Sequence, residues 1–330
     1  MIKTAFAGFE HPHMTGLYND LKSNPFFSVS DAFEPDSAAR KRAEENGVAF
    51  GNFASYAEFL KKTDADVVAV GSHYAARGKV IIEALKAGKH IIADKPFCTR
   101  PEELAEIRRI AGKNNLGVCI LLSLRKSGSI LAALEAVKSG TVGKINNIIF
   151  EGEHPLMYGK RADWYFEEGK HGGVINDIAI HGIDLVRIFT DSDVDKVIGA
   201  REWNFYAREV PHFLDSAQFM LKMKSGAGVI ADVSYSAPND YGYSHPAYWH
   251  IRLFGEKGLL DVKDGADEIT FYPSKGEITK FKAITEEKDL LTEFAEILHD
   301  GTKINEYTEE MLNSTEQTLT IQKHADNSEH

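Results

Sequence analysis

The chain has 330 residues, of which 43% are hydrophobic and 26% are charged, and its formal net charge is −11. This length allows two domains with sizeable cores, while the acidic balance argues against broad binding to nucleic acid or to anionic membranes. The amino terminus lacks a secretory pattern, no apolar run is long enough to cross a membrane, and the two cysteines have no metal-like spacing, so we expect a cytoplasmic protein with reduced thiols.

The first 122 residues alternate short apolar runs with helical patterns. The predicted strands are residues 2–8, 27–33, 67–71, 90–94 and 117–122. The predicted helices are residues 14–22, 37–46, 56–62, 76–87 and 101–114. Because strands that alternate with helices form parallel sheets with right-handed crossovers, this half predicts an α/β domain.

The second half changes its period. After a helical pattern at residues 129–139, long runs typical of strands follow, and two helices are predicted at residues 289–299 and 308–323. The predicted strands are residues 144–153, 194–205, 216–223, 228–235, 249–254, 259–263, 268–272 and 278–282. Consecutive strands of this kind favour a largely antiparallel open sheet in an α+β domain. We therefore expect two domains, residues 1–122 and 123–330.

A first candidate site lies in the segment that begins at Gly172 and Gly173. Two glycines allow a tight turn, and an apolar-periodic segment follows. If that segment is helical, Asp177, His181 and Asp184 share one face,. A histidine flanked by carboxylates is a plausible general base with its own orienting group, and it is equally compatible with a structural histidine held by aspartate.

A second candidate site lies at residues 86–96, where a helix end leads through a glycine into a short apolar strand. The strand ends at Asp94 and Lys95, followed by Pro96. Lysine is unusual at the end of a buried strand because desolvation disfavours the ammonium, so a surface loop is the plainer interpretation. The position at the carboxyl end of a parallel strand favours function, since open α/β sheets bind ligands there.

Taken in order, Asp94-Lys95-Pro96 and the Gly172-Gly173 segment with Asp177 and His181 resemble two motifs of one family. That family is the glucose–fructose oxidoreductase / inositol dehydrogenase (Gfo/Idh/MocA) family of NAD(P)-dependent oxidoreductases. Residues 123–125 and 253–258 are similar to further family segments, so the resemblance extends over nearly the whole chain. It implies an amino-terminal Rossmann-type parallel sheet, followed by a domain for substrate binding and oligomerisation.

The resemblance implies hydride transfer between NAD(P) and a hydroxyl carbon of a sugar, polyol or inositol. In that reaction, Lys95 would hydrogen-bond the reacting oxygen and His181 would take its proton. Asp177 would orient His181 or pair with Lys95, and Asp184 would be a partner on the helix face. The candidate substrate contacts are His154, Tyr158, Arg161 and Trp164, although Trp164 is equally suited to packing,.

The cofactor end departs from the family's Gly-x-Gly-x-x-Gly pattern, because residues 8–13 retain only the first glycine, Gly8. Glu10 stands at the second glycine position and His13 at the third. The acids after the second strand have no basic partner, which favours NAD over NADP. The expected cofactor contacts are Gly8, Phe9, His13, Asp31, Glu34, Ser72, His73, Asp94 and Lys95. A metal at His11 and His13 ranks below cofactor contact, because zinc normally needs three or four ligands.

Two alternatives to a dehydrogenase stay open. The broken glycine pattern favours a regulatory protein that senses a sugar or nucleotide without turnover, and an enzyme that recycles a bound NAD is the other.

We also expect a homodimer or homotetramer through the second-domain sheet, since its helices cover one face and Val229, Ala231 and Val233 lie beside further apolar positions,. The other expected partner is a small carbohydrate or cyclitol.

Overall fold

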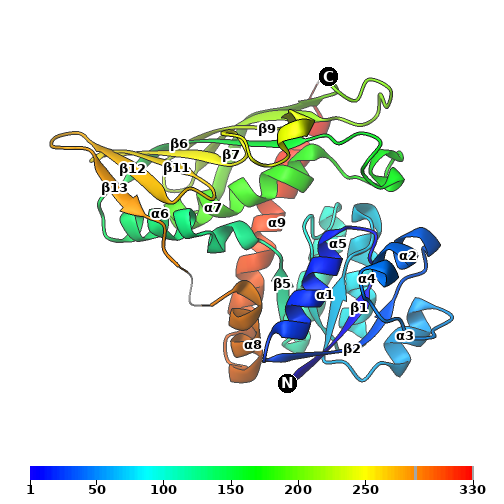
Figure 1. Cartoon of the computed structure of the whole chain (residues 1–330). Coiled ribbons are helices and arrows are strands. Elements are labelled where there is room, and N and C mark those ends of the chain that lie inside the picture. Colours follow the sequence, from blue (N-terminus) through cyan, green and yellow to red (C-terminus); the bar gives the residue numbers. More distant parts are fainter. Residues whose placement is uncertain (286–287, 329–330) are drawn as a thin grey trace. The chain divides into compact units, whose positions relative to one another are not determined.

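The computed structural model describes residues 1–285 and 288–328, and its contacts divide the chain into two compact units (Figure 1). The first unit comprises Met1–Leu121, Ala162–Gly172 and Lys288–Glu316. The second unit comprises Leu122–Arg161, Gly173–Glu287 and Gln317–His330. The chain first passes between units beside the boundary expected at residue 122. Two later segments, Ala162–Gly172 and Lys288–Glu316, also belong to the first unit. A single boundary along the chain therefore does not describe the two units.

The first unit contains the predicted parallel sheet, with five strands in the order β2-β1-β3-β4-β5. The strands are β1 (Ile2–Ala7), β2 (Phe27–Phe33), β3 (Val67–Val70), β4 (His90–Ala93) and β5 (Val118–Ile120). The order reverses between β1 and β3, which lie side by side. Parallel sheets of this type bind ligands at the carboxyl ends of the strands beside such a reversal.

The helices of this unit begin and end where local signals place them. They are α1 (His13–Ser23), α2 (Ser37–Glu45), α3 (Tyr56–Lys62), α4 (Tyr74–Lys86), α5 (Pro101–Asn114) and α8 (Leu290–Asp300). Asp36 and Ser55 accept hydrogen bonds from backbone N–H groups in the first turns of α2 and α3,. Pro101 occupies the first turn of α5, and Asn115 ends that helix in the left-handed region at φ 51°,.

The second unit contains an eight-stranded sheet in the order β13-β12-β11-β10-β6-β9-β8-β7. Its strands are β6 (Ile145–Pro155), β7 (Val194–Trp203), β8 (Ser216–Met223), β9 (Gly228–Ala237), β10 (His250–Gly255), β11 (Gly258–Lys263), β12 (Glu268–Pro273) and β13 (Thr279–Lys282). Neighbouring strands pair antiparallel, except that β6 and β9 pair parallel. The predicted largely antiparallel sheet is thus confirmed.

Helices α6 (Gly128–Lys138) and α7 (Ile180–Thr190) lie on one side of this sheet (Figure 1). A Cβ on Gly182 would meet the Phe150 ring at 2.3 Å, so the glycine lets α7 pack directly on β6. Along β9, Val229, Ala231 and Val233 are buried, while Ile230 between them is 49% exposed. Successive side chains of β9 therefore point alternately to the sheet face that the helices cover and to the opposite, exposed face.

The remaining elements are short helical turns and one long helix. They are η1 (Ser123–Lys126), η2 (Asp163–Phe166), η3 (Ile175–Ala179), η4 (Asn239–Tyr241) and α9 (Ile304–Asp326). Helix α9 begins four residues before the predicted start at residue 308. Across residues 1–285 and 288–328, no helix is both long and apolar enough to cross a membrane.

Candidate functional site

The turn after β1 packs directly against the turn after β3. Gly8 has φ +97°, and a Cβ built there would lie 2.6 Å from the backbone nitrogen of Ser72. Only glycine accepts both the positive φ and the close approach. The predicted cofactor residues Gly8 and Ser72 are therefore neighbours at the carboxyl edge of the sheet.

Glu10, at the second glycine position, binds the protein's own backbone. Its Oε2 accepts a hydrogen bond from the His73 N–H at 2.7 Å. Its backbone oxygen accepts one from Trp164 Nε1 at 3.2 Å. Phe9 turns inward, where its ring packs against Phe6 and is 4% exposed. The glycine-poor turn is thus held by an acid, an indole and a core aromatic ring.

Glu34 follows β2, at the position expected to read the ribose, but its carboxylate binds two backbone N–H groups. It accepts from Phe9 and, at 2.7 Å, from Asp36. Burial raises the pKa of Glu34 to about 7, in spite of these two hydrogen bonds,. The other expected acid, Asp31, accepts a hydrogen bond from the Thr63 hydroxyl at 3.1 Å. Both acids therefore bind partners within the first unit.

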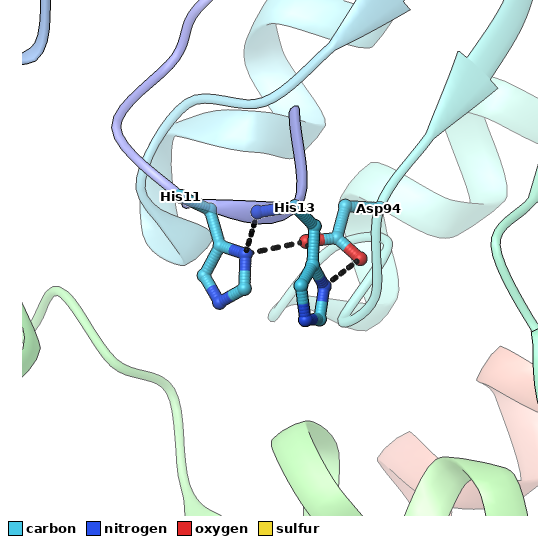
Figure 2. A group of neighbouring side chains, drawn as sticks. All are labelled: His11, His13 and Asp94. Carbon is cyan, nitrogen blue, oxygen red and sulfur yellow. Dashed lines mark hydrogen bonds and ion pairs between the residues drawn. The ribbon is translucent and has the colours of Figure 1, made fainter. Parts of the chain in front are cut away.

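His11, His13 and Asp94 form a cluster where β1 and β4 end (Figure 2). Asp94 Oδ2 lies 2.9 Å from His11 Nδ1, and Asp94 Oδ1 lies 3.2 Å from His13 Nδ1. Burial lowers the pKa of His11 to about 4, against the pull of Asp94. Burial alone would raise the pKa of Asp94, but His13 and His11 hold it well below its usual range. Asp94 is thus an ionised, almost fully buried carboxylate.

Lys95 follows directly and is only 6% exposed. Its N–H donates to Asp94 Oδ1 at 2.8 Å. Arg77, on α4, is fully buried and donates to the backbone oxygens of Asp94 at 3.0 Å, Pro96 at 2.7 Å and Ser72 at 2.9 Å. One guanidinium therefore fixes the loops after β3 and β4 together, which sets the position of the Lys95 backbone.

The sequence reasoning missed Arg77. The sequence does indicate that Arg77 is buried, because it lies three residues after Tyr74 and four before Ile81, and both of these are buried in α4. A charged residue on the apolar face of a helix needs buried partners. Local pattern does not say which loops supply them.

Trp164, a predicted substrate contact, belongs to the first unit together with η2. Its ring lies 4.9 Å from the Tyr74 ring and 4.5 Å from the Tyr165 ring, and it is 6% exposed. Tyr74 and Tyr165 share a hydrogen bond between their hydroxyls. These contacts support the packing interpretation of Trp164.

In the second unit, the segment of Asp177 and His181 is helical but starts as a π-helix, η3, before α7. The wider turn shifts the spacing expected from a regular α-helix, and π-turns are frequent at functional sites. Asp177 accepts a hydrogen bond from the Tyr235 hydroxyl on β9. Asp184 accepts from Arg125 Nε at 2.9 Å, with both side chains buried. Asp184 thus joins α7 to η1.

Two predicted substrate residues contact aromatic side chains near Asp177 and His181. The Arg161 guanidinium lies 5.1 Å from the Tyr235 ring centre, next to Asp177. The Trp249 ring lies 5.9 Å from the His154 ring and 5.8 Å from the His181 ring. Tyr158, the remaining predicted residue, is 48% exposed. Tyr235 was missed, although its inward position on β9 follows the alternation of that strand.

The two glycines before η3 both need their positive φ values. Gly172 has φ +82° and Gly173 has φ +97°. A Cβ on Gly172 would lie 2.3 Å from Thr99 Cγ2, and one on Gly173 would lie 2.1 Å from Gln322 Oε1. The expected tight turn is present, and each glycine packs within its own unit.

The carboxyl edge of the first sheet meets the main needs of a dinucleotide. Gly8 gives the close backbone approach, and α1 begins shortly after this turn, as the phosphate-binding helix of a dinucleotide site does, although its first N–H, that of His13, is directed to His11 Nδ1,. The carboxylates of Glu10 and Glu34 would oppose a pyrophosphate, but backbone N–H groups bind both. These residues fit NAD, with fewer glycine contacts than a full glycine-rich turn gives.

Comparison with known proteins agrees with this architecture. A family model described as "Oxidoreductase family, NAD-binding Rossmann fold" matches residues 7–120, and "GFO/IDH/MocA C-terminal domain" matches residues 130–261. Myo-inositol 2-dehydrogenase from Thermotoga maritima is 27% identical over 71% of this chain and 66% of that protein. The chain spans 50% of the length of the first curated relatives that it matches.

Solved structures share the fold over almost the whole chain. A protein from Erwinia carotovora atroseptica aligns with a TM-score of 0.87 and 22% identity, covering 98% of this chain and 99% of that one. Scyllo-inositol dehydrogenase from Lactobacillus casei, with bound NAD(H) and scyllo-inositol, aligns with a TM-score of 0.77 and 20% identity, covering 99% and 97%. At these identities the likeness shows the fold.

Proposed function

We propose, from the premise that this chain belongs to the Gfo/Idh/MocA family of oxidoreductases, that it transfers a hydride between NAD and a hydroxyl carbon of a sugar, polyol or inositol. The observation that carries the proposal is Lys95, a buried lysine directly after β4 at the carboxyl edge of a parallel sheet. Open α/β sheets bind their ligands at this edge. Relatives with inositol dehydrogenase activity support the substrate class.

Lys95 acts as the electrophilic group in this proposal. Its ammonium hydrogen-bonds the substrate oxygen and stabilises the negative charge that develops there as the proton leaves. Arg77 holds the backbone on both sides of Lys95, which fixes the point from which its side chain extends. Bound NAD supplies the hydride acceptor.

His181 is the proposed general base, and Asp177 its positioning residue. His181 removes the hydroxyl proton, while Asp177 is fixed by the Tyr235 hydroxyl. Arg161 and His154 lie beside this group through Tyr235 and Trp249, and they are the proposed substrate contacts. Aromatic rings and an arginine are suited to the faces and hydroxyls of a sugar.

The proposed cofactor is NAD rather than NADP. Gly8 would receive the pyrophosphate and Ser72 would lie at the nicotinamide end. Asp31 within β2 and Glu34 directly after it place acids at the end of that strand, where a 2′-phosphate would be repelled,. Calorimetric titration with NAD and NADP tests this directly. Tighter binding of NADP would contradict the assignment.

Activity is tested with a panel of sugars and inositols, followed as NADH absorbance. Lys95→Met should abolish turnover while the melting temperature stays close to that of the wild type. His181→Ala should lower the rate by roughly 10² to 10⁴ and flatten its rise with pH, as expected for removal of a general base. Full activity in Lys95→Met would contradict the mechanism.

A regulatory protein without turnover is the second candidate, and the loss of two glycines from the turn after β1 favours it. Glu10 and His13 stand at the two positions where the glycine-rich pattern brings backbone close to the pyrophosphate,. A sensor would bind a sugar or nucleotide but convert no member of the panel. Ligand-induced stabilisation in a wild type without turnover would support this candidate over the dehydrogenase.

Self-association is proposed through the open face of the second-unit sheet. Ile230 pairs with Met220 on one side and with Ile149 on the other. Ile230 and Met220 are 49% and 46% exposed. An apolar row of this kind is a common interface. Sedimentation should show a dimer or tetramer at micromolar concentration, and Ile230→Asp should weaken it; a monomer of 36.7 kDa in the wild type would contradict the proposal.

A further inference from the structure

His11, His13 and Asp94 bring three ligand-type side chains together at the carboxyl edge of the first sheet. Among the residues that the structure describes, these three side chains offer ligand atoms that all lie within 4.8 Å of one another. Figure 2 shows both imidazole rings turned with Nδ1 toward the same carboxylate. The Nδ1 atoms approach Asp94 from two sides, at 2.9 Å for His11 and 3.2 Å for His13.

His11 Nδ1 is shared between two neighbours. It lies 2.9 Å from Asp94 Oδ2, and the backbone N–H of His13 points to it at 3.3 Å. On the other side of the ring, Nε2 faces the buried Tyr165 hydroxyl at 3.5 Å, where an N–H can be directed. His11 Nδ1 thus contacts both the Asp94 carboxylate and the His13 N–H, and a bound cation would take the place of the hydrogen bond to Asp94.

The spacing of the three groups also suits one metal ion. Imidazole nitrogen and carboxylate oxygen bind zinc at about 2.0–2.2 Å, so ligand atoms around one ion lie about 3.0–3.5 Å apart. The two nitrogen–oxygen distances of 2.9 and 3.2 Å are close to this range. Two histidines and one carboxylate form a typical set for zinc and for other divalent transition metals.

We propose that His11 Nδ1, His13 Nδ1 and the Asp94 carboxylate bind a divalent transition-metal ion such as Zn²⁺ at the carboxyl edge of the first sheet. Asp94 and His11 are buried, so they supply a preformed pair of ligands. The side chain of His13 is 54% exposed, which gives the ion a route from solvent. Tyr165 would fix the ring of His11, as partners beyond the ligands commonly do in metal sites. The proposal does not depend on NAD binding or on turnover.

Zinc binding by the full chain tests the proposal. The protein is treated with a chelator, dialysed and titrated with ZnCl₂ by calorimetry, and the bound zinc is counted by elemental analysis. We expect one ion per chain and a zinc-dependent rise in melting temperature, because a ligand that binds the folded state stabilises it. Co²⁺ should give visible absorption bands from the same site.

His13→Gln is the principal variant, because its half-exposed side chain can be replaced without opening the core. It should weaken zinc binding by at least roughly tenfold, as loss of a ligand exceeds loss of an outer partner. His324→Gln, which changes an exposed histidine of the second unit, is the matched control and should bind zinc as the wild type does. Asp94→Asn removes the carboxylate as a second, independent test.

Two results would overturn the proposal. One is a wild type that binds no zinc under these conditions. The other is zinc binding of wild-type strength in both His13→Gln and Asp94→Asn, since the ion would then lie elsewhere on the surface. If His13→Gln does not fold, the Co²⁺ spectrum decides, because Asp94→Asn must change it.

Discussion

Replacing Glu34 by glutamine should change how the stability of the protein depends on pH. The side chain is 3% exposed, and its pKa rises from 4.5 to about 7 on folding because burial disfavours the carboxylate. Between these two values the folded protein holds a proton that the unfolded chain has released. Rising pH therefore favours the unfolded state in this window, and stability contributed by protonated Glu34 is lost as the pH passes through 7.

The magnitude follows from the shift. Roughly 2.5 pKa units at about 1.36 kcal/mol each give about 3 kcal/mol, present below pH 4.5 and absent above the folded pKa,. Glu34→Gln cannot lose a proton, so its stability lacks this component. The variant gives up one of the two hydrogen bonds that the carboxylate accepts, from Phe9 and Asp36, at a cost that is independent of pH,.

The assay is urea unfolding of both proteins without cofactor at several values between about pH 5 and pH 8. The free energy of unfolding of the wild type should fall relative to that of Glu34→Gln by most of this amount. Glu202, whose pKa burial also raises to about 7, is present in both proteins and cancels in the comparison. Glu45→Gln, an exposed control at the end of α2, should follow the wild type. Parallel curves for wild type and Glu34→Gln would refute the reasoning.

Three further predictions concern the groups that hold each unit together. Arg77→Met should lower the free energy of unfolding by about 3 kcal/mol or more in urea titration, because three buried carbonyl oxygens lose a charged donor,; a change below about 1 kcal/mol would contradict it. Gly8→Ala should cost at least about 1–2 kcal/mol, since φ is +97° and a Cβ meets Ser72,, and an unchanged melting temperature would count against this. Arg125→Met should cost about 3–5 kcal/mol by leaving buried Asp184 without its ion pair,. Adding Asp184→Leu should restore most of the lost free energy of unfolding, because no buried charge then stays unpaired. If the double variant is no more stable than Arg125→Met, the ion pair is not the source of the destabilisation.

Local patterns in the sequence determined the elements and their class. Buried strands such as β3, in which all four residues are apolar and buried, alternate with helices that are capped by Asp36 or Ser55 or that begin at Pro101. Such signals act over a few residues, so the chain alone predicts a parallel sheet followed by a largely antiparallel one. The glycine pair before η3 and the lysine after β4 were visible for the same reason, because each is defined by its immediate neighbours.

The tertiary structure alone decided which distant groups meet. Glu34 reaches the backbone of Phe9 because β2 and β1 are neighbours in the sheet, and His11 reaches Asp94 because β1 and β4 end at the same edge. Asp177 reaches Tyr235 because η3 packs on β9. Strand order is fixed by the packing of whole elements, which local periodicity does not encode. Glu34 stands at the position from which an acid would bind the ribose hydroxyls. In the structure its carboxylate binds backbone N–H groups instead. Residue type and spacing thus located the candidate groups, while burial and long-range contact set their charge, partners and orientation.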